Sequence, residues 1–147
     1  MSDTENLVAA YAELYLRFVR VMDRRMAAEG ASLARTRLLL FLQRKGPMRA
    51  TAIAEFFDQS PRTVTEAIDT LERDGLVRRK PDPSDRRAKL VSVTPAGLEA
   101  VRKTEPLRSQ MVERTFGVLN AEEKAWLAEI LERLSATLPG SGEGPEG

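Results

Sequence analysis

Apolar residues recur every three or four positions over about residues 4–28, a spacing that predicts one long amphipathic helix. The stripe consists of Leu7, Tyr11, Leu14, Phe18, Met22 and Met26, and it is widened by Val8, Tyr15 and Val19. Two interpretations stay open. The helix has either one wide core face or two apolar faces, of which the second is buried in a partner chain. Gly30 is expected to end this helix.

Two shorter helical patterns follow, each closed by residues that stop a helix. The first covers about 35–44 and ends at Lys45-Gly46-Pro47, a C-cap glycine followed by proline. The second covers about 51–57 and leads into a tight turn at 58–60. Both are short enough to pack inside one small lobe.

Ser60-Pro61 is a strong helix start, because serine suits the N-cap and proline suits the first helical position. The helix is predicted to run to about Asp74 and to end at Gly75. Its buried stripe consists of Val64, Ala67, Ile68 and Leu71. Two helices joined by a turn of about three or four residues predict a helix-turn-helix.

A β-hairpin is predicted directly after the helix-turn-helix. Residues 76–79 and 88–93 have the alternation of short strands, and PDPSDRR between them is a proline-punctuated loop. A hairpin in this place is a wing. The predicted fold is therefore mostly α with a small β-hairpin wing, a winged helix-turn-helix.

The C-terminal third returns to helical patterns. Thr94-Pro95 should start a helix that continues toward Phe116, although Pro106 should kink or interrupt it. Asn120 to Glu123 resembles a capping box. It opens a last helix whose apolar face consists of Leu127, Ile130, Leu131, Leu134 and Leu138. The tail over 139–147 has no core-forming residue and is expected to be disordered.

Composition narrows the function classes. The 147 residues fit one domain, and the chain contains neither cysteine nor histidine. Disulfides, thiol redox switches and His or Cys zinc sites are therefore excluded, and metal chemistry is left to carboxylates alone. No apolar run is long enough to suggest a membrane span. We expect a cytoplasmic protein with no membrane partner, no cofactor and no enzymatic activity.

Charge is segregated along the chain. Residues 31–90 carry 13 Lys and Arg against 8 Asp and Glu, a balance of +5, whereas the remainder carries 10 against 14, a balance of −4. A basic middle between acidic ends favours a surface that faces a polyanion over ordinary solvated helix faces.

The predicted second helix of the helix-turn-helix has hydroxyls and an arginine near its N-terminal end, where phosphates and base edges can be contacted. The hairpin adds three further basic residues, backed by Arg78, Arg79 and Lys80. An arginine at a narrow hairpin tip can enter the minor groove. Asp85 is expected to orient such a guanidinium through a bidentate bond. The alternative is a solvated hairpin with an exposed ion pair.

The order of these elements, Asp85-x-Arg87, and Leu90-Val-Ser-Val-Thr94-x-x-Gly97 resemble the MarR family of bacterial transcription regulators over about residues 5–138. The resemblance implies a single domain over 1–147 that contains a DNA-binding lobe at 34–93. Dimerisation helices are implied at 4–30 and 95–138. It also implies a homodimer that binds palindromic operators in double-stranded DNA, more often as a repressor than as an activator, with small effectors commonly releasing the DNA.

Carried over residue by residue, the resemblance makes Arg87 the minor-groove arginine and Asp85 the residue that positions it. Glu66 departs from the family, in which this position is often basic; it accepts from a cytosine N4 group or faces solvent. The predicted DNA-binding residues are Ser60, Arg62, Thr63, Thr65, Glu66, Arg73, Arg86, Arg87 and Lys89.

The resemblance implies an effector site between the dimerisation helices and the DNA-binding lobe, and candidate residues for it are assigned only by element. The candidate residues are Tyr15, Phe18, Met22, Arg37 and Phe41, and the alternative is that each is an ordinary core or surface residue. One alternative function stays open: a winged-helix protein-interaction module that does not read DNA, for which the acidic Glu66 and Asp69 lend support.

Overall fold

The computed structural model describes residues 2–139 and contains six helices and one two-stranded antiparallel hairpin over that range. The elements are α1 (Asp3–Ala28), α2 (Leu33–Lys45), α3 (Ala50–Phe57), α4 (Pro61–Arg73), β1 (Val77–Asp82), β2 (Asp85–Val93), α5 (Pro95–Phe116) and α6 (Ala121–Ser135). The predicted fold class is confirmed. The predicted disorder of the tail concerns, from residue 140 on, residues outside the described range. Within residues 2–139, no helix combines the length and apolar character needed to cross a membrane.

Most helices begin where the sequence predicts them, since the N-cap side chains are present. Ser60, Thr94 and Asn120 each accept a hydrogen bond from the backbone N–H three residues later. The Asn120 cap is completed by Glu123 in a capping box. The helix predicted from about residue 35 instead starts at Leu33, because Ser32 is its N-cap.

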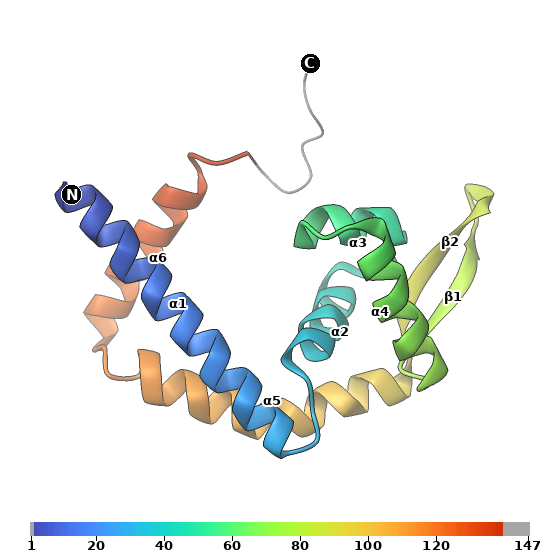
Figure 1. Ribbon diagram of the computed structural model, residues 1–147, viewed down its shortest axis with the longest axis horizontal. Helices are drawn as coiled ribbons and strands as arrows, with labels where there is room; N and C mark the ends of the chain where they lie inside the picture. The colour runs from blue at the N-terminus through green and yellow to red at the C-terminus, as the bar shows by residue number, and fades with distance from the viewer. Residues whose placement is uncertain (1, 140–147) are drawn as a thin grey trace.

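The winged lobe, which we define as residues 33–93, holds the larger core. α2, α3 and α4 pack around this core together with the hairpin, on one side of the molecule (Figure 1). The buried side chains of this core include Leu42, Ile53, Ile68, Leu71, Val77 and Val91. Three members of the predicted stripe of α4 are buried, namely Val64, Ile68 and Leu71, and these positions are confirmed as the face that packs α4 on the lobe. Ala67, the fourth member, is exposed.

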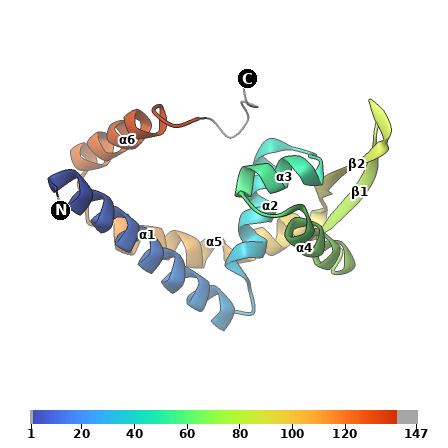
Figure 2. The ribbon, with the colours of Figure 1, turned by 45° about the horizontal axis from the view of Figure 1, so that its top comes forward.

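The helical arm, which we define as α1, α6 and the C-terminal half of α5, lies on the other side (Figures 1 and 2). Its small core contains Met22, Met26 and Met111, and the rings of Phe18 and Phe116 meet edge to face with centroids 5.7 Å apart. α6 has no buried residue. The arm is therefore far less buried than the winged lobe within one chain.

Pro106 does not interrupt α5, which is continuous from Pro95 to Phe116. Proline removes the donor that would reach the carbonyl of residue 102. One residue earlier, the Val101 carbonyl accepts from the hydroxyl of Thr104 at 2.7 Å and from the guanidinium of Arg108 at 3.5 Å. These side chains supply hydrogen bonds at the turn where the proline lies.

Candidate nucleic-acid interface

The helix-turn-helix consists of α3 and α4. Asp58 adopts a left-handed backbone with φ of 50° and ends α3, so that the chain turns within three residues. Ser60 then caps α4: its Oγ accepts from Thr63 N–H at 3.1 Å and lies 2.8 Å from the Thr63 hydroxyl. The hydroxyls of Ser60 and Thr63 thus form a hydrogen-bonded pair at the N-terminus of α4, and the third predicted hydroxyl, on Thr65, lies exposed one residue after the end of the first turn.

The outer face of α4 is nearly neutral. Helical spacing sets Arg62, Glu66 and Arg73 opposite the buried residues Val64 and Ile68. Arg62 Nε donates to Glu66 Oε1 at 3.2 Å, and both side chains are exposed. Arg62 is therefore partly balanced by the residue that departs from the family pattern.

Two acidic residues of α4 hold the wing. Arg79 on β1 donates from Nη2 to Asp69 at 2.6 Å and from Nη1 to Glu72 at 2.9 Å, while its backbone N–H reaches Glu72 at 3.1 Å. Partial burial alone would lower the pKa of Arg79, but these hydrogen bonds outweigh it and raise the pKa above its ordinary value. The expectation that Arg79 adds to the basic patch of the hairpin is wrong, because its guanidinium forms ion pairs with Asp69 and Glu72 of α4.

The strands of the hairpin are longer than predicted. Only Pro83 and Ser84 lie between β1 and β2, so most of the predicted PDPSDRR loop is strand. Pro81, which as a proline predicts a loop, lies inside β1. β1 is an edge strand, however, and an edge strand tolerates proline.

A bulge in β2 carries the arginines of the wing. Pro81 pairs with Lys89 and Asp82 with Asp85, so β1 advances one residue while β2 advances four. The extra residues are 86–88, and such bulges re-aim side chains away from the regular ladder. Within residues 2–139 no ion pair engages the exposed cations of the hairpin, which are Arg78, Lys80, Arg86, Arg87 and Lys89.

Asp85 contacts Arg87 differently from the prediction. Its Oδ1 accepts from the backbone N–H of Arg87 at 3.0 Å, and the predicted bidentate bond to a guanidinium is not formed. An aspartate bonded to the N–H two residues later makes an Asx turn. Asp85 therefore fixes the backbone of the bulge and leaves the Arg87 guanidinium unengaged.

The base of the wing is joined to α5 by Thr94 and Gly97. The Thr94 hydroxyl donates to the Gly75 carbonyl at 2.6 Å and accepts from Gly97 N–H at 3.1 Å. A Cβ on Gly97 would lie 2.2 Å from the Leu76 carbonyl oxygen. The Thr-x-x-Gly motif therefore allows three segments to meet: the end of α4, the hairpin and α5. Gly75, with φ of 75°, makes the predicted turn from α4 into the wing.

The five effector candidates do not gather in one place. Phe41 packs on Phe56 and Phe57 in the winged lobe, and Arg37 is exposed on α2. The other three lie on α1, where Met22 is buried and Tyr15 is 47% exposed. Predicting these residues by element alone combined two separate regions of the molecule.

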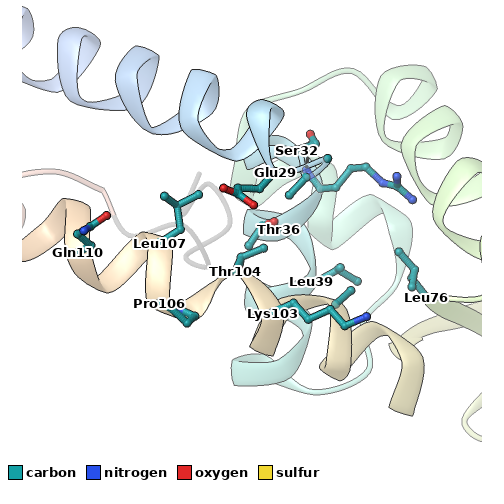
Figure 3. Close-up of a pocket in the computed structure, with 14 residues that line it drawn as sticks. Glu29, Ser32, Thr36, Leu39, Leu76, Lys103, Thr104, Pro106, Leu107 and Gln110 are labelled. Atoms are coloured by element: carbon teal, nitrogen blue, oxygen red, sulfur yellow. Dashed lines mark hydrogen bonds between the residues drawn. The ribbon is translucent and has the colours of Figure 1, made fainter.

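A cleft lies at the predicted junction, but other residues form its walls. It has a volume of about 760 Å³ and runs between the α1–α2 connection and α5 (Figure 3). Its polar lining includes Glu29, Thr36, Lys103 and Gln110, and none of the five candidates lines it.

Arg35 extends from α2 along this cleft. One of its terminal nitrogens forms an ion pair with Asp74, the C-cap of α4, whereas its Nε is buried without a hydrogen-bond partner among residues 2–139. Arg35 thus connects the cleft to the end of α4. The sequence did not single out Arg35, nor did it single out Arg49, whose guanidinium bonds to Asp82. The signal available for Arg49 was its position, because arginine is unusual at a helix N-cap.

Solved structures of similar proteins include regulators with known binding partners. Sco3205 of Streptomyces coelicolor, a MarR-family transcriptional regulator solved in complex with DNA, has a TM-score of 0.80 and 27% identity over 96% of this chain and 91% of that one. BpsR of Bordetella bronchiseptica, whose DNA binding is regulated by 6-hydroxynicotinic acid, has a TM-score of 0.76. Its identity is 25% over 92% of this chain and 96% of BpsR.

Sequence comparison gives the same assignment. The sequence profile of the MarR family matches residues 32–89. The chain is 30% identical over 98 residues to the uncharacterized HTH-type transcriptional regulator YxaD of Bacillus subtilis, with 67% of this chain and 68% of YxaD covered. The profile match covers the helix-turn-helix and most of the wing, and the relatives share the whole fold: this chain belongs to the MarR family of transcriptional regulators.

Proposed function

We propose that the protein is a homodimeric repressor that reads a palindromic operator in double-stranded DNA and releases it when a small effector binds. The observation that carries the proposal is the β2 bulge, because it presents Arg86 and Arg87 on an exposed hairpin beside a helix-turn-helix. The DNA complex of Sco3205 supports DNA as the partner. Such a regulator would act in the cytoplasm.

α4 would enter the major groove, which is about 12 Å wide and admits one helix. The hydroxyls of Ser60 and Thr63 at the N-terminus of α4 would contact phosphates, while Arg87 would enter the minor groove. Glu66 would accept from a cytosine N4 group or remain paired with Arg62 in solvent. The proposed DNA contacts are Ser60, Arg62, Thr63, Thr65, Glu66, Arg73, Arg86, Arg87 and Lys89, with Asp85 positioning the wing.

The exposed apolar residues of the helical arm support a homodimer. Monomers rarely leave so many large apolar side chains of one region in water. Pairing of α1 and α6 with the same helices of a second copy would bury them, and twofold symmetry would match a palindromic operator. The exposed residues include Leu7, Val8, Tyr11, Leu14, Leu16, Trp126, Ile130 and Leu134. Leu138, predicted on the face of the last helix, is also exposed but lies after α6, which ends at Ser135.

DNA binding is tested by titrating the protein against a duplex that it selects from a random-sequence pool, at several salt concentrations. Because neutralised phosphates release counterions, affinity should fall steeply with salt. Arg87→Ala should weaken binding by about 1–3 kcal/mol, which is about fivefold to somewhat more than a hundredfold. Arg102→Ala, an exposed arginine on α5 paired with Glu99, is the matched control and should bind as the wild type does.

Equal affinities of the Arg87→Ala and wild-type proteins would contradict the role given to the wing. A folded protein with no salt-sensitive DNA binding would instead favour the protein-interaction module. A monomer in light scattering at micromolar concentration would contradict the homodimer and, with it, the palindromic operator.

An effector in the cleft would have a direct route to α4, because Arg35 lines the cleft and pairs with Asp74 at the end of that helix. The buried Nε of Arg35 and the nearby Lys103 favour a small acidic molecule. The regulation of BpsR by 6-hydroxynicotinic acid supports this ligand class.

Small aromatic acids, 6-hydroxynicotinic acid among them, can be screened for release of the selected duplex. An active acid should lose its effect on Arg35→Met and keep it on Arg37→Met, since Arg37 lies on the same helix but outside this cleft. Asp74→Ala breaks the same ion pair and should still bind the acid in calorimetry. Release that is unchanged in Arg35→Met would contradict this site.

A further inference from the structure

Arg49 occupies a position where its side chain cannot do what the position usually requires. It is the N-cap of α3, and no side-chain hydrogen bond caps that helix. Ser, Thr, Asn or Asp normally accepts a backbone N–H there, whereas arginine has no acceptor. The contacts of its side chain are made elsewhere.

The guanidinium of Arg49 reaches the wing. Its Nε and Nη2 donate to Asp82 Oδ2 at 3.0 and 2.8 Å. Asp82 is the last residue of β1 and is buried, with 8% of its surface exposed. A buried carboxylate that accepts charge-assisted hydrogen bonds is held in one position, unlike a solvated carboxylate on the surface.

The second oxygen of Asp82 holds the tip of the wing. Its Oδ1 accepts from the backbone N–H of Ser84 at 2.9 Å and from the Ser84 hydroxyl at 2.8 Å. The Ser84 backbone N–H, the Arg49 guanidinium and the Ser84 hydroxyl together lower the pKa of Asp82 to about 2, so the carboxylate stays ionised at neutral pH. One side chain therefore connects the start of α3 to the two-residue turn.

The backbone reinforces the same connection. Met48, the residue before Arg49, exchanges two hydrogen bonds with Val91 of β2, at 3.0 and 2.7 Å. Asp85 and the bulge with Arg87 follow immediately after the turn that Asp82 holds. The direction of the bulge relative to the helix-turn-helix thus depends on this set of contacts.

We infer that Arg49 is a positioning residue for DNA binding: through Asp82 and Ser84 it holds the wing tip at a fixed angle to α3 and α4. The inference rests on the proposed function, because it requires that the wing bind DNA. Arg87 then meets the duplex from a preorganised hairpin, and less side-chain and loop entropy is lost on binding.

The competing explanation is a direct contact between Arg49 and a phosphate, since the Arg49 side chain is 43% exposed. The two explanations differ in the sign of one effect. If Arg49 only contacted a phosphate, Asp82→Ala would remove a negative charge beside it and tighten DNA binding. If Arg49 positions the wing, Asp82→Ala should weaken binding.

The experiment measures the affinity of the full chain for a duplex selected by the wild type, for Arg49→Ala, Asp82→Ala and the double variant, across several salt concentrations. Each single variant should bind on the order of tenfold more weakly, and the double variant no more weakly than either, because both break the same connection. The salt slope of Arg49→Ala should equal that of the wild type, whereas loss of a phosphate contact would reduce it by about one.

Arg49→Lys should recover part of the affinity, because an ammonium can still donate to Asp82. Arg102→Ala and Glu99→Ala repeat the two charge changes at an exposed pair on α5 and should leave affinity unchanged. In the free protein, NMR order parameters of residues 83–88 should fall in Arg49→Ala and not in Arg102→Ala. This measurement separates a positioning role from general destabilisation, as does a thermal unfolding curve for each variant.

Tighter binding by Asp82→Ala, or a reduced salt slope in Arg49→Ala, would overturn the inference and leave the proposed function intact. Additive losses in the double variant would overturn it as well. Failure of the wild-type protein to select any duplex would overturn the proposed function, and the inference with it.

Discussion

The winged lobe and the helical arm use similar amounts of apolar sequence for different purposes. In the lobe, the apolar stripe of α4 is buried: Leu71 is 1% exposed and Ile68 is fully covered. In the arm, Leu134 of α6 is 59% exposed and Leu7 of α1 is 70% exposed. The lobe completes its core within one chain, whereas the arm presents residues of the same chemical type to its surroundings.

The two regions also differ in how charge is arranged. In the lobe, ion pairs cross between elements: Arg79 joins β1 to α4, and Arg49 joins α3 to β1. In α1, by contrast, Arg17 pairs with Glu13 one turn away, where both are exposed and contribute little. The cross-element pairs fix the orientation of the wing relative to the helix-turn-helix.

The largest effect is expected from Leu71→Ala in the lobe. Removing a fully buried leucine leaves a cavity and should lower the free energy of unfolding by about 2–5 kcal/mol. Urea unfolding monitored by circular dichroism measures it. The loss should be the same at low and high protein concentration, and a loss that depends on concentration would contradict a core completed within one chain.

Gly97→Ala should have the next largest effect on stability, because the new Cβ would lie 2.2 Å from the backbone carbonyl oxygen of Leu76, which cannot move freely. We expect a loss of about 2–3 kcal/mol, the upper range for overpacking. Gly30→Ala is the control: Gly30 has φ of 75° but open space around its Cβ position, so only the backbone conformation costs energy, about 1 kcal/mol. Equal losses for the two variants in thermal unfolding would contradict the close contact at Gly97.

Leu134→Ala repeats the chemistry of Leu71→Ala in the arm. Because Leu134 is exposed in one chain, the variant should weaken self-association by about 1–2 kcal/mol and leave unfolding of the lobe unchanged. Sedimentation equilibrium measures the association constant. An unchanged association constant would show that Leu134 lies outside the proposed dimer interface.

The smallest expected effect is the loss, at acid pH, of the stabilisation that Asp82 provides. Asp82 has its pKa lowered from 3.8 to about 2 in the folded protein, so the stabilisation it provides is complete above about pH 4 and disappears as the pH falls through 2. The difference in unfolding free energy between the wild type and Asp82→Asn should therefore shrink between pH 6 and pH 2. A difference that grows as the pH falls would contradict the hydrogen bonds assigned to Asp82.

Local signals in the sequence were sufficient for most of the fold. Ser60-Pro61, Thr94-Pro95 and Asn120 to Glu123 begin helices because capping uses atoms within three residues of the helix start. The apolar stripe of α4 could also be predicted, because helical periodicity is a local property of the sequence. The hairpin was also predicted, but its length was not, because Pro81 stops a strand only when the strand has neighbours on both sides.

Long-range partners could not be predicted in this way. Arg79 was expected on a basic patch, and only the packing of β1 beside α4 brings it to Asp69 and Glu72. Arg35 was likewise missed, because Asp74 is 39 residues away in the sequence. Charge in a sequence predicts a sign and a region but not which charges neutralise each other.

The sequence by itself determined the helices and the hairpin, their order, most of the buried face of α4 and the basic wing, since each depends on periodicity, capping or composition within one segment. Only the tertiary structure decided that the arginines of the wing lie in a bulge, that the acidic residues of α4 hold β1, and that the cleft has Arg35 rather than Tyr15 in its wall. The physical reason is that side-chain partners are selected by distance in space, and distances between segments are set by packing of the whole chain.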